Sequence, residues 1–200
     1  GVEPAVIAQR LAGSWTCDDL SMQDLLNPAD NHHENINKPY PFCLASPLQE
    51  QADTLGQLAD WQVEWKWDGI RAQLLTTGGG SGMLWSRGEE SIEESFPEIL
   101  ECIPHLPPGV CLDGEILAWG REGLRSFSRL QKRLGRKQPG PSVQKKEPVR
   151  FQAYDLLRID GDDLRAQPMS ERRKQLEKLI QSLPNYLPLG ISPLVQENDW

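Results

Sequence analysis

The chain has 200 residues, of which 38% are hydrophobic and 25% are charged, so it can bury a core and is not disordered by composition. No apolar run approaches the roughly 18 residues of a membrane span, and the N-terminus lacks the basic-then-apolar layout of a signal peptide. Four cysteines without CxxC spacing favour a reducing, intracellular setting. The net charge of −8 argues at first sight against a nucleic-acid partner.

The charge is unevenly distributed along the chain. Residues 121–150 contain ten basic and two acidic side chains, a net charge of +8, which leaves −16 on the other 170 residues. Such a segment is a candidate for contact with a phosphate backbone, because neutralised phosphates release condensed counterions. A solvated helix face followed by a loop is the alternative that the charge count leaves open.

The first half of the chain is predicted to change from helix to strand. Residues 1–36 contain two short helical patterns, the second over 19–26, and a linker rich in Asn and Pro follows. Alternating side chains predict strands over 62–67 and 70–77. The glycines of 78–82 then form a turn into a strand over 83–86, which completes a β-hairpin; no Gly-Lys-Ser/Thr follows, so a P-loop is excluded.

The second half is predicted to alternate between helices and strands. Helical spacing covers 91–103, and a strand over 110–119 is broken at Asp113-Gly114-Glu115. We expect a helix over 124–136, a loop over 138–148, a strand over 149–159, and a helix over 170–182 with Ser170 as N-cap. This order indicates an α+β domain built on an antiparallel sheet.

Four short segments carry the chemistry: Glu64-Trp65-Lys66-Trp67-Asp68-Gly69-Ile70-Arg71, Trp85-Ser86-Arg87-Gly88, Leu112-Asp113-Gly114-Glu115 and Phe151-Gln152-Ala153-Tyr154-Asp155. Each alone is unremarkable, since Asp-Gly is a common turn dipeptide. In this order they resemble motifs I, III and IIIa, and the motif between I and III, of the covalent nucleotidyltransferases, which include polynucleotide ligases and messenger-RNA capping enzymes. Over roughly residues 37–200, the details are most similar to bacterial ATP-dependent DNA ligases.

The resemblance implies an α+β nucleotidyltransferase (ATP-grasp-like) adenylation domain with antiparallel sheets and flanking helices, preceded by a helical remnant. Residues 1–36 would be the C-terminal tail of a helical DNA-binding domain plus a linker. Residues 37–200 would be the N-terminal and central part of the adenylation domain. The family's later Glu-Gly motif and phosphate-gripping lysines are not found after Tyr154. We therefore expect a front portion of a ligase that adenylates itself poorly when alone.

The resemblance also implies a reaction. Lys66 would attack the α-phosphorus of ATP, and the intact enzyme would pass AMP to the 5′-phosphate of a nick and seal it with the 3′-hydroxyl, in DNA repair, replication or recombination. A nucleophilic lysine must be neutral, and Lys66, between two tryptophans at a predicted strand end, is placed for desolvation. The expected partners are ATP, Mg²⁺ and nicked double-stranded DNA.

Further ATP-site roles follow from the resemblance. Glu64 would read the adenine amino group, and Tyr154 would stack on the purine unless it is an ordinary core tyrosine. Glu115 would contact the ribose or a metal ion. Arg71 and Arg87 would hold the nucleotide or the nick 5′-phosphate.

At the nick, Asp68 would orient the 3′-hydroxyl or a metal ion. Asp113 is interpreted as a turn residue rather than a ligand. The cations with three- and four-residue spacing would form one helix face that contacts the DNA backbone: Arg129, Lys132, Arg133 and Arg136.

Three alternatives stay open: an RNA ligase or capping-type transferase, a non-catalytic fragment that only binds DNA, and NAD⁺ as the adenylate donor. The remaining expectations are a monomer without membrane contact, located in the bacterial cytoplasm and associated with the nucleoid.

Overall fold

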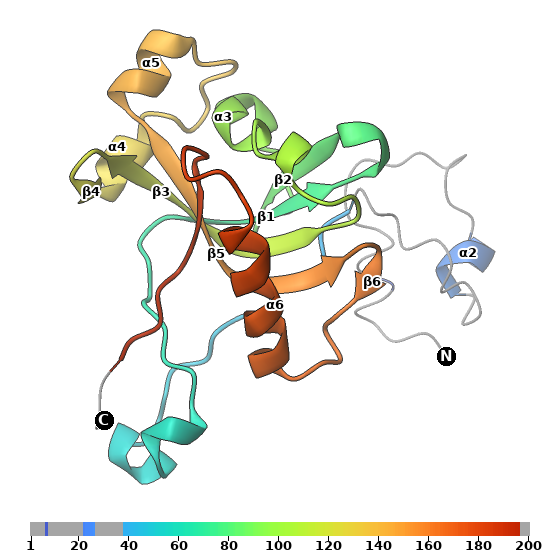
Figure 1. Cartoon of the computed structure of the whole chain (residues 1–200), viewed down its shortest axis with the longest axis vertical. Coiled ribbons are helices and arrows are strands. Elements are labelled where there is room, and N and C mark those ends of the chain that lie inside the picture. Colours follow the sequence, from blue (N-terminus) through green and yellow to red (C-terminus); the bar gives the residue numbers. More distant parts are fainter. Residues whose placement is uncertain (1–6, 8–21, 27–37, 197–200) are drawn as a thin grey trace.

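A seven-stranded sheet lies at the centre of the protein. The computed structural model describes Ile7, residues 22–26 and residues 38–196. The strand order is β2-β1-β3-β5-β6, with β4 paired to β3 and β7 paired to β5 (Figure 1). Among the strand pairs of the described residues, only β5–β7 is parallel. The strands are β1 (Ile70–Thr76), β2 (Gly82–Ser86), β3 (Cys111–Gly120), β4 (Gly123–Leu124), β5 (Val149–Ile159), β6 (Asp162–Asp163) and β7 (Leu189–Ile191).

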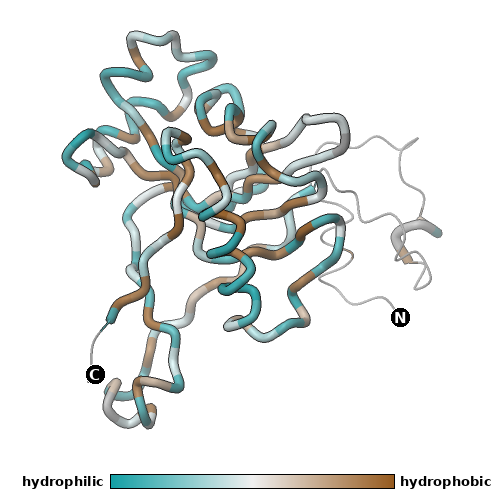
Figure 2. The backbone as a smooth tube through the Cα atoms, in the orientation of Figure 1, coloured by the Kyte–Doolittle hydropathy of each residue, from teal (hydrophilic) through white to brown (hydrophobic). Residues whose placement is uncertain are grey.

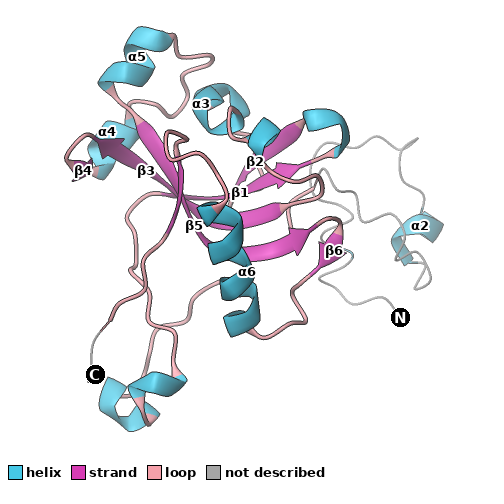
Figure 3. Ribbon diagram, viewed as in Figure 1, coloured by secondary structure: helices cyan, strands magenta, loops and turns pink. Residues whose placement is uncertain are grey.

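Short helices surround the sheet, and one longer helix crosses it (Figure 3). The α-helices are α2 (Met22–Leu26), α3 (Pro97–Leu100), α4 (Phe127–Gln131), α5 (Pro141–Lys146) and α6 (Met169–Gln181). The 3-10 turns are Ala52–Leu55, Leu58–Asp60, Gly78–Gly80, Glu93–Ser95 and Ile103–His105. In the described part of the chain, no helix is long and apolar enough to cross a bilayer.

The two faces of the sheet have different environments. Ala72 and Leu74 of β1 belong to the main core cluster, which includes Leu176 and Leu179 of α6. Since side chains alternate along a strand, Arg71, Gln73 and Leu75 project from the other face. There Leu75 joins a smaller cluster with Tyr40, Trp85, Cys111 and Leu157. Apolar residues are concentrated along the strands in Figure 2. One face is therefore covered by helices, and the other combines apolar with charged side chains.

The hairpin β1–β2 and the strand over 149–159 confirm the sequence prediction. A strand over 62–67 is wrong: this segment makes only an isolated bridge between Glu64 and Leu194. Its partner segment contains Pro193, which has no N–H to continue a ladder. The predicted break at 113–115 is also wrong, because β3 is continuous. Gly114 is required for packing, since a Cβ there would lie 2.5 Å from Phe151 Cε1.

Helix boundaries differ from the prediction where proline intervenes. The predicted helix over 91–103 is divided into short turns: Pro97 is the first residue of α3, and Pro104 is the second residue of the turn Ile103–His105. Within residues 124–136, Leu124 ends β4 and only Phe127–Gln131 is helical, as α4, while Pro141 begins α5 inside the predicted loop. Helix α6 begins at Met169, so Ser170 is not its N-cap. The helix predicted over 19–26 is described only as α2, and the rest of the N-terminal prediction lies outside the described residues.

Candidate active site

Strands β1 and β3 bring together three charged side chains of the predicted site. Arg71 pairs with Glu115, and Gln73 pairs with Asp113, so these four residues share the face opposite the main core. Arg71 holds Asp113 in a bidentate ion pair, with Nε–Oδ1 and Nη2–Oδ2 distances of 3.2 and 2.9 Å. Asp113 is 4% exposed. Its interpretation as a turn residue is wrong: it is a buried carboxylate that fixes Arg71.

A register shift between β3 and β5 places Tyr154 against this pair. Asp113 lies opposite Asp155, whereas Gly114 lies opposite Ala153, so Tyr154 is an extra residue on β5. Such bulges re-aim side chains. The Tyr154 hydroxyl donates to Asp113 Oδ1 at 3.3 Å, and the Arg71 Cζ lies 5.7 Å from the ring centroid. Three strands thus contribute to one cluster of Arg71, Asp113, Glu115 and Tyr154.

The loop that carries Lys66, residues 61–69 (the Lys66 loop), runs close to Glu115. A Cβ on Gly69 would lie 2.7 Å from both Glu115 Cγ and Leu117 Cδ2, so only glycine permits this approach. The Gly69 N–H donates to Glu115, and the charge of Lys66 acts on the same carboxyl. Lys66 itself is exposed, and Trp65 is 56% exposed. The expected desolvation of Lys66 between its tryptophans is therefore wrong for this structure.

Glu64 lies where the Lys66 loop meets the segment after β7. It bridges Leu194, and Gln62 Nε2 donates to its Oε1 at 2.7 Å. Trp67 Nε1 donates to Ser192 Oγ at 2.9 Å, which ties the same loop to the end of β7. Burial raises the pKa of Glu64 above its ordinary value, against the opposing effects of Gln62 and Arg173.

Burial also changes the protonation of the two carboxyls in the cluster. It raises the pKa of Glu115 to about 7, against the opposing charge of Arg71. It raises the pKa of Asp113 as well, although the ion pair with Arg71 opposes this rise. Glu115 therefore titrates near neutral pH, where a bound cation would favour its ionised form.

Two predicted site residues do not join the cluster through their side chains. Arg87 is exposed, and only its backbone N–H reaches the site strand, donating to the carbonyl of Arg71 at 3.0 Å. Asp68 is also exposed. Arg87 lies one residue after β2, and Asp68 lies in the Lys66 loop immediately before Gly69.

The basic segment does not form the single cationic helix face expected for it. Arg133 is completely buried: it pairs with Glu98 at 2.6 Å, donates to the carbonyls of Ser95 and Glu147, and lies 5.5 Å from the Phe96 ring. The DNA-contact prediction for Arg133 is therefore wrong. Arg129, Lys132 and Arg136 are exposed, although the first two pair with Glu147.

Comparison with known proteins identifies the family. The model of the ATP dependent DNA ligase domain matches residues 42–196, which contain the cluster and the Lys66 loop. The chain belongs to the ATP-dependent DNA ligase domain family.

Relatives of this ligase domain include named ligases. It is 37% identical over 142 residues to a probable DNA ligase of Koribacter versatilis, covering 71% of this chain and 24% of that protein. It is 42% identical over 130 residues to a probable DNA ligase of Opitutus terrae, covering 64% and 13%. The ligase domain of Mycobacterium tuberculosis LigD is similar with a TM-score of 0.56 and 28% identity, covering 71% and 42%. A mycobacterial DNA ligase D complexed with ATP matches with a TM-score of 0.55. The nucleotidyltransferase fold prediction is confirmed.

The ligase domain spans about a quarter or less of the two curated relatives named above. Its described residues contain no group of three or more His, Cys, Asp or Glu side chains arranged for a metal ion. A Mg²⁺ ion is commonly held by one or two carboxylates together with substrate phosphates, and Glu115 fits that role.

Sequence reasoning missed two parts of the site. Asp113 precedes the Gly-Glu of its motif, and a prediction that β3 is continuous would have placed it on the face of Glu115. Phe42 and Cys43 contact Arg71 from a segment assigned to the domain's beginning without any role. No periodicity or motif in that segment indicated the contact.

Proposed function

We propose that this domain carries out the adenylation chemistry of an ATP-dependent DNA ligase, with Lys66 as the nucleophile. Its Nζ would form a bond to the α-phosphorus of ATP while the bond to pyrophosphate breaks, and the lysine loses a proton. The observation that carries the proposal is that Gly69, three residues after Lys66, lies against Glu115 in the cluster that also holds Arg71 and Tyr154. The family match supports the same reaction.

The cluster offers groups of the right chemistry for ATP. Arg71 uses three of its five N–H donors on Asp113 and on the Cys43 carbonyl, which leaves two for phosphate oxygens. The aromatic ring of Tyr154 suits a purine. Glu64, with its raised pKa, would accept from or donate to the adenine edge. Glu115 would contact the ribose or Mg²⁺, which offsets charge on the transferring phosphoryl group.

Nicked double-stranded DNA is the proposed acceptor of the adenylate. The exposed cations Arg129, Lys132 and Arg136 would contact its backbone, while Arg87 and Asp68 would act at the nick. The names of the relatives and the exposure of these side chains support this part. Monomeric state, nucleoid location and the domain assignment of residues 1–36 stay predictions.

Intact-mass measurement after incubation with ATP and Mg²⁺ tests the proposal. Because this portion alone is expected to adenylate itself poorly, a small but detectable fraction of the chain should gain the mass of one adenylate, and Lys66→Met should abolish that gain. Lys174→Met, an exposed lysine of α6 paired with Glu171, is the matched control and should leave the gain unchanged. An undiminished adduct on the Lys66→Met protein would refute the assignment.

A further inference from the structure

Phe42 and Cys43, which lie upstream of the Lys66 loop, contact the guanidinium of Arg71. The Cys43 carbonyl accepts a hydrogen bond from Arg71 Nη1, and the Phe42 ring centroid lies 5.5 Å from the Arg71 Cζ. The Tyr154 ring lies 5.7 Å from the same carbon. Arg71 thus contacts residues 42–43, β3 and β5. A cation over an aromatic ring is attracted electrostatically to the ring face, so these contacts favour one orientation of the guanidinium.

Segment 40–43 is itself fixed to the sheet. The Tyr40 N–H donates to Gln73 Oε1 at 2.8 Å, and Gln73 Nε2 donates to the Tyr40 carbonyl at 3.1 Å. Gln73 is completely buried and lies two residues after Arg71 on the same strand face. Tyr40 is 1% exposed, and Arg165 Cζ lies 3.9 Å from its ring centroid. The backbone of segment 40–43 is therefore held in place beside Arg71.

The hydrogen bonds of Arg71 within the protein leave two of its N–H donors for a ligand. Asp113 takes the Nε and one Nη2 hydrogen of Arg71, and Cys43 takes one on Nη1. One N–H on each Nη remains, and the side chain is 21% exposed, so these donors can reach a ligand. Two such donors match the spacing of oxygens in a phosphate.

We propose that segment 40–43 is part of the phosphate-binding site, and that Phe42 and Gln73 are positioning residues that hold Arg71 with its two remaining donors directed at a phosphate of the nucleotide. The inference rests on the proposed ATP chemistry. Segment 40–43 would then determine how strongly Arg71 contributes to nucleotide affinity.

A double-mutant cycle on the full chain tests the proposal, with ATP and Mg²⁺ affinity measured by calorimetry. Phe42→Ala should weaken binding about tenfold, and Phe42→Tyr should restore it because the ring remains. In an Arg71→Met background, Phe42→Ala should have no further effect, because it acts through Arg71. Losses that simply multiply in the double variant would overturn the inference, whereas failure of the unaltered chain to bind ATP would overturn the proposed function instead.

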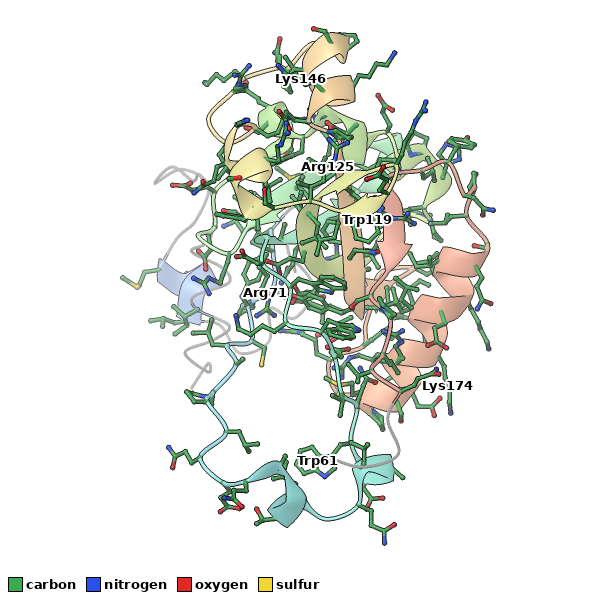
Figure 4. All side chains as sticks on the ribbon, turned by 90° about the vertical axis from the view of Figure 1, so that its left-hand side faces the viewer. Trp61, Arg71, Trp119, Arg125, Lys146 and Lys174 are labelled. Carbon is green, nitrogen blue, oxygen red and sulfur yellow. The ribbon has the colours of Figure 1, made fainter. Side chains whose placement is uncertain are left out.

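Nitrogen NMR of the Arg71 side chain tests the positioning without ATP. The Arg71 Nε–H signal, assigned by its loss in Arg71→Lys, should exchange slowly in the unaltered chain. Gln73→Met, which removes both hydrogen bonds to Tyr40, and Phe42→Ala should each speed the exchange at least severalfold. Trp61→Ala, in the lobe that Figure 4 shows away from Arg71, is the control and should leave it unchanged. Unchanged exchange in folded Phe42→Ala would overturn the positioning role.

Discussion

Arg71 is the residue on which the site depends, because it contacts three separate parts of the chain. It ion-pairs with Asp113 of β3, lies near the Tyr154 ring of β5, and donates to the Cys43 carbonyl. Its pKa is raised by the hydrogen bond and charge of Asp113, which outweigh the larger single effect of burial. The guanidinium therefore stays charged, and its orientation is set before any ligand arrives.

Asp113→Asn should loosen Arg71 and destabilise the domain. Removing one partner of a buried ion pair leaves the other charge uncompensated, which costs about 3–5 kcal/mol. Because Arg71 is 21% exposed, solvent screening reduces this cost to about 1–2 kcal/mol. Urea unfolding measures the change. Equal unfolding midpoints and equal ATP affinity for Asp113→Asn would contradict the role given to this carboxylate.

Glu115 gives the site a pH dependence with a definite sign. Its pKa is raised from 4.5 to about 7, so the folded state binds more protons than the unfolded state between these values. This carboxyl therefore favours folding below pH 4.5 and loses that contribution as pH rises through about 7. Glu115→Gln mimics the neutral form. Between pH 5 and pH 8, measured without metal, the unfolding free energy of Glu115→Gln should increase relative to that of the unaltered chain. A difference between the two proteins that does not change with pH would show that the pKa of Glu115 is not raised.

At the level of elements, the register between β3 and β5 decides which side chains face the site. The extra residue at Tyr154 turns this ring onto the face of Arg71 and Glu115. Gly114 enables the close contact with Phe151 on the other face. The same short stretch of sheet thus closes the core on one side and builds the cluster on the other.

Gly114→Ala should disturb both functions of this stretch. A Cβ would lie 2.5 Å from Phe151 Cε1 and 2.6 Å from the Gln152 carbonyl oxygen, so the strands must move apart. Overpacking of this kind costs about 1–3 kcal/mol. Thermal unfolding should report the loss, and Gly140→Ala, where a Cβ meets nothing within 4 Å, should not show it. A neutral Gly114→Ala would mean that the strands adapt freely.

The sequence could predict those elements that are specified by patterns within one short segment, but not those that depend on contacts between distant segments. Alternation and turn glycines predicted the hairpin and strand 149–159, and the ordered motifs predicted which residues to examine. The shift that re-aims Tyr154 arises between strands about 40 positions apart, and no local pattern encodes it. Likewise the burial of Arg133 depends on Glu98 and Ser95, so helical spacing alone misplaced it on a surface.

In the whole molecule, the cluster of Arg71, Asp113, Glu115 and Tyr154 and the basic segment 121–150 lie at different positions relative to β3. Asp113 and Glu115 lie in the first half of this strand, and Gly120 ends it beside β4 and α4. Figure 4 shows Arg125 and Lys146 on the part of the molecule beyond Trp119, while Trp61 lies in the opposite lobe. Arg133 anchors this basic part to α3 through Glu98.

The exposed and buried cations of this segment should respond differently to substitution. Replacing Arg129, Lys132 and Arg136 with Gln should weaken binding to nicked duplex and lower its salt slope by about 0.9 for each phosphate that is no longer neutralised. Stability should fall by less than in Arg133→Gln: the variant leaves the buried Glu147 carboxylate without Arg129 and Lys132, but both of these cations are about half exposed, so solvent already screens the two ion pairs. Arg133→Gln should instead lower the unfolding free energy by about 3–5 kcal/mol, since it leaves Glu98 unpaired. Fluorescence titration at several salt concentrations measures DNA binding, and denaturant unfolding measures stability. A triple variant that binds nicked duplex normally, or an Arg133→Gln protein of unchanged stability, would contradict the roles given to these cations.

Lys66 is the proposed acceptor of the adenylate, and mapping the modified residue distinguishes it from every other lysine of the chain. The full chain would be incubated with ATP and Mg²⁺, digested, and sequenced by tandem mass spectrometry. We expect the mass of AMP on the peptide that contains Lys66, between Trp65 and Trp67. Adenylate on a different lysine, or pyrophosphate release without any adduct on Lys66, would contradict it.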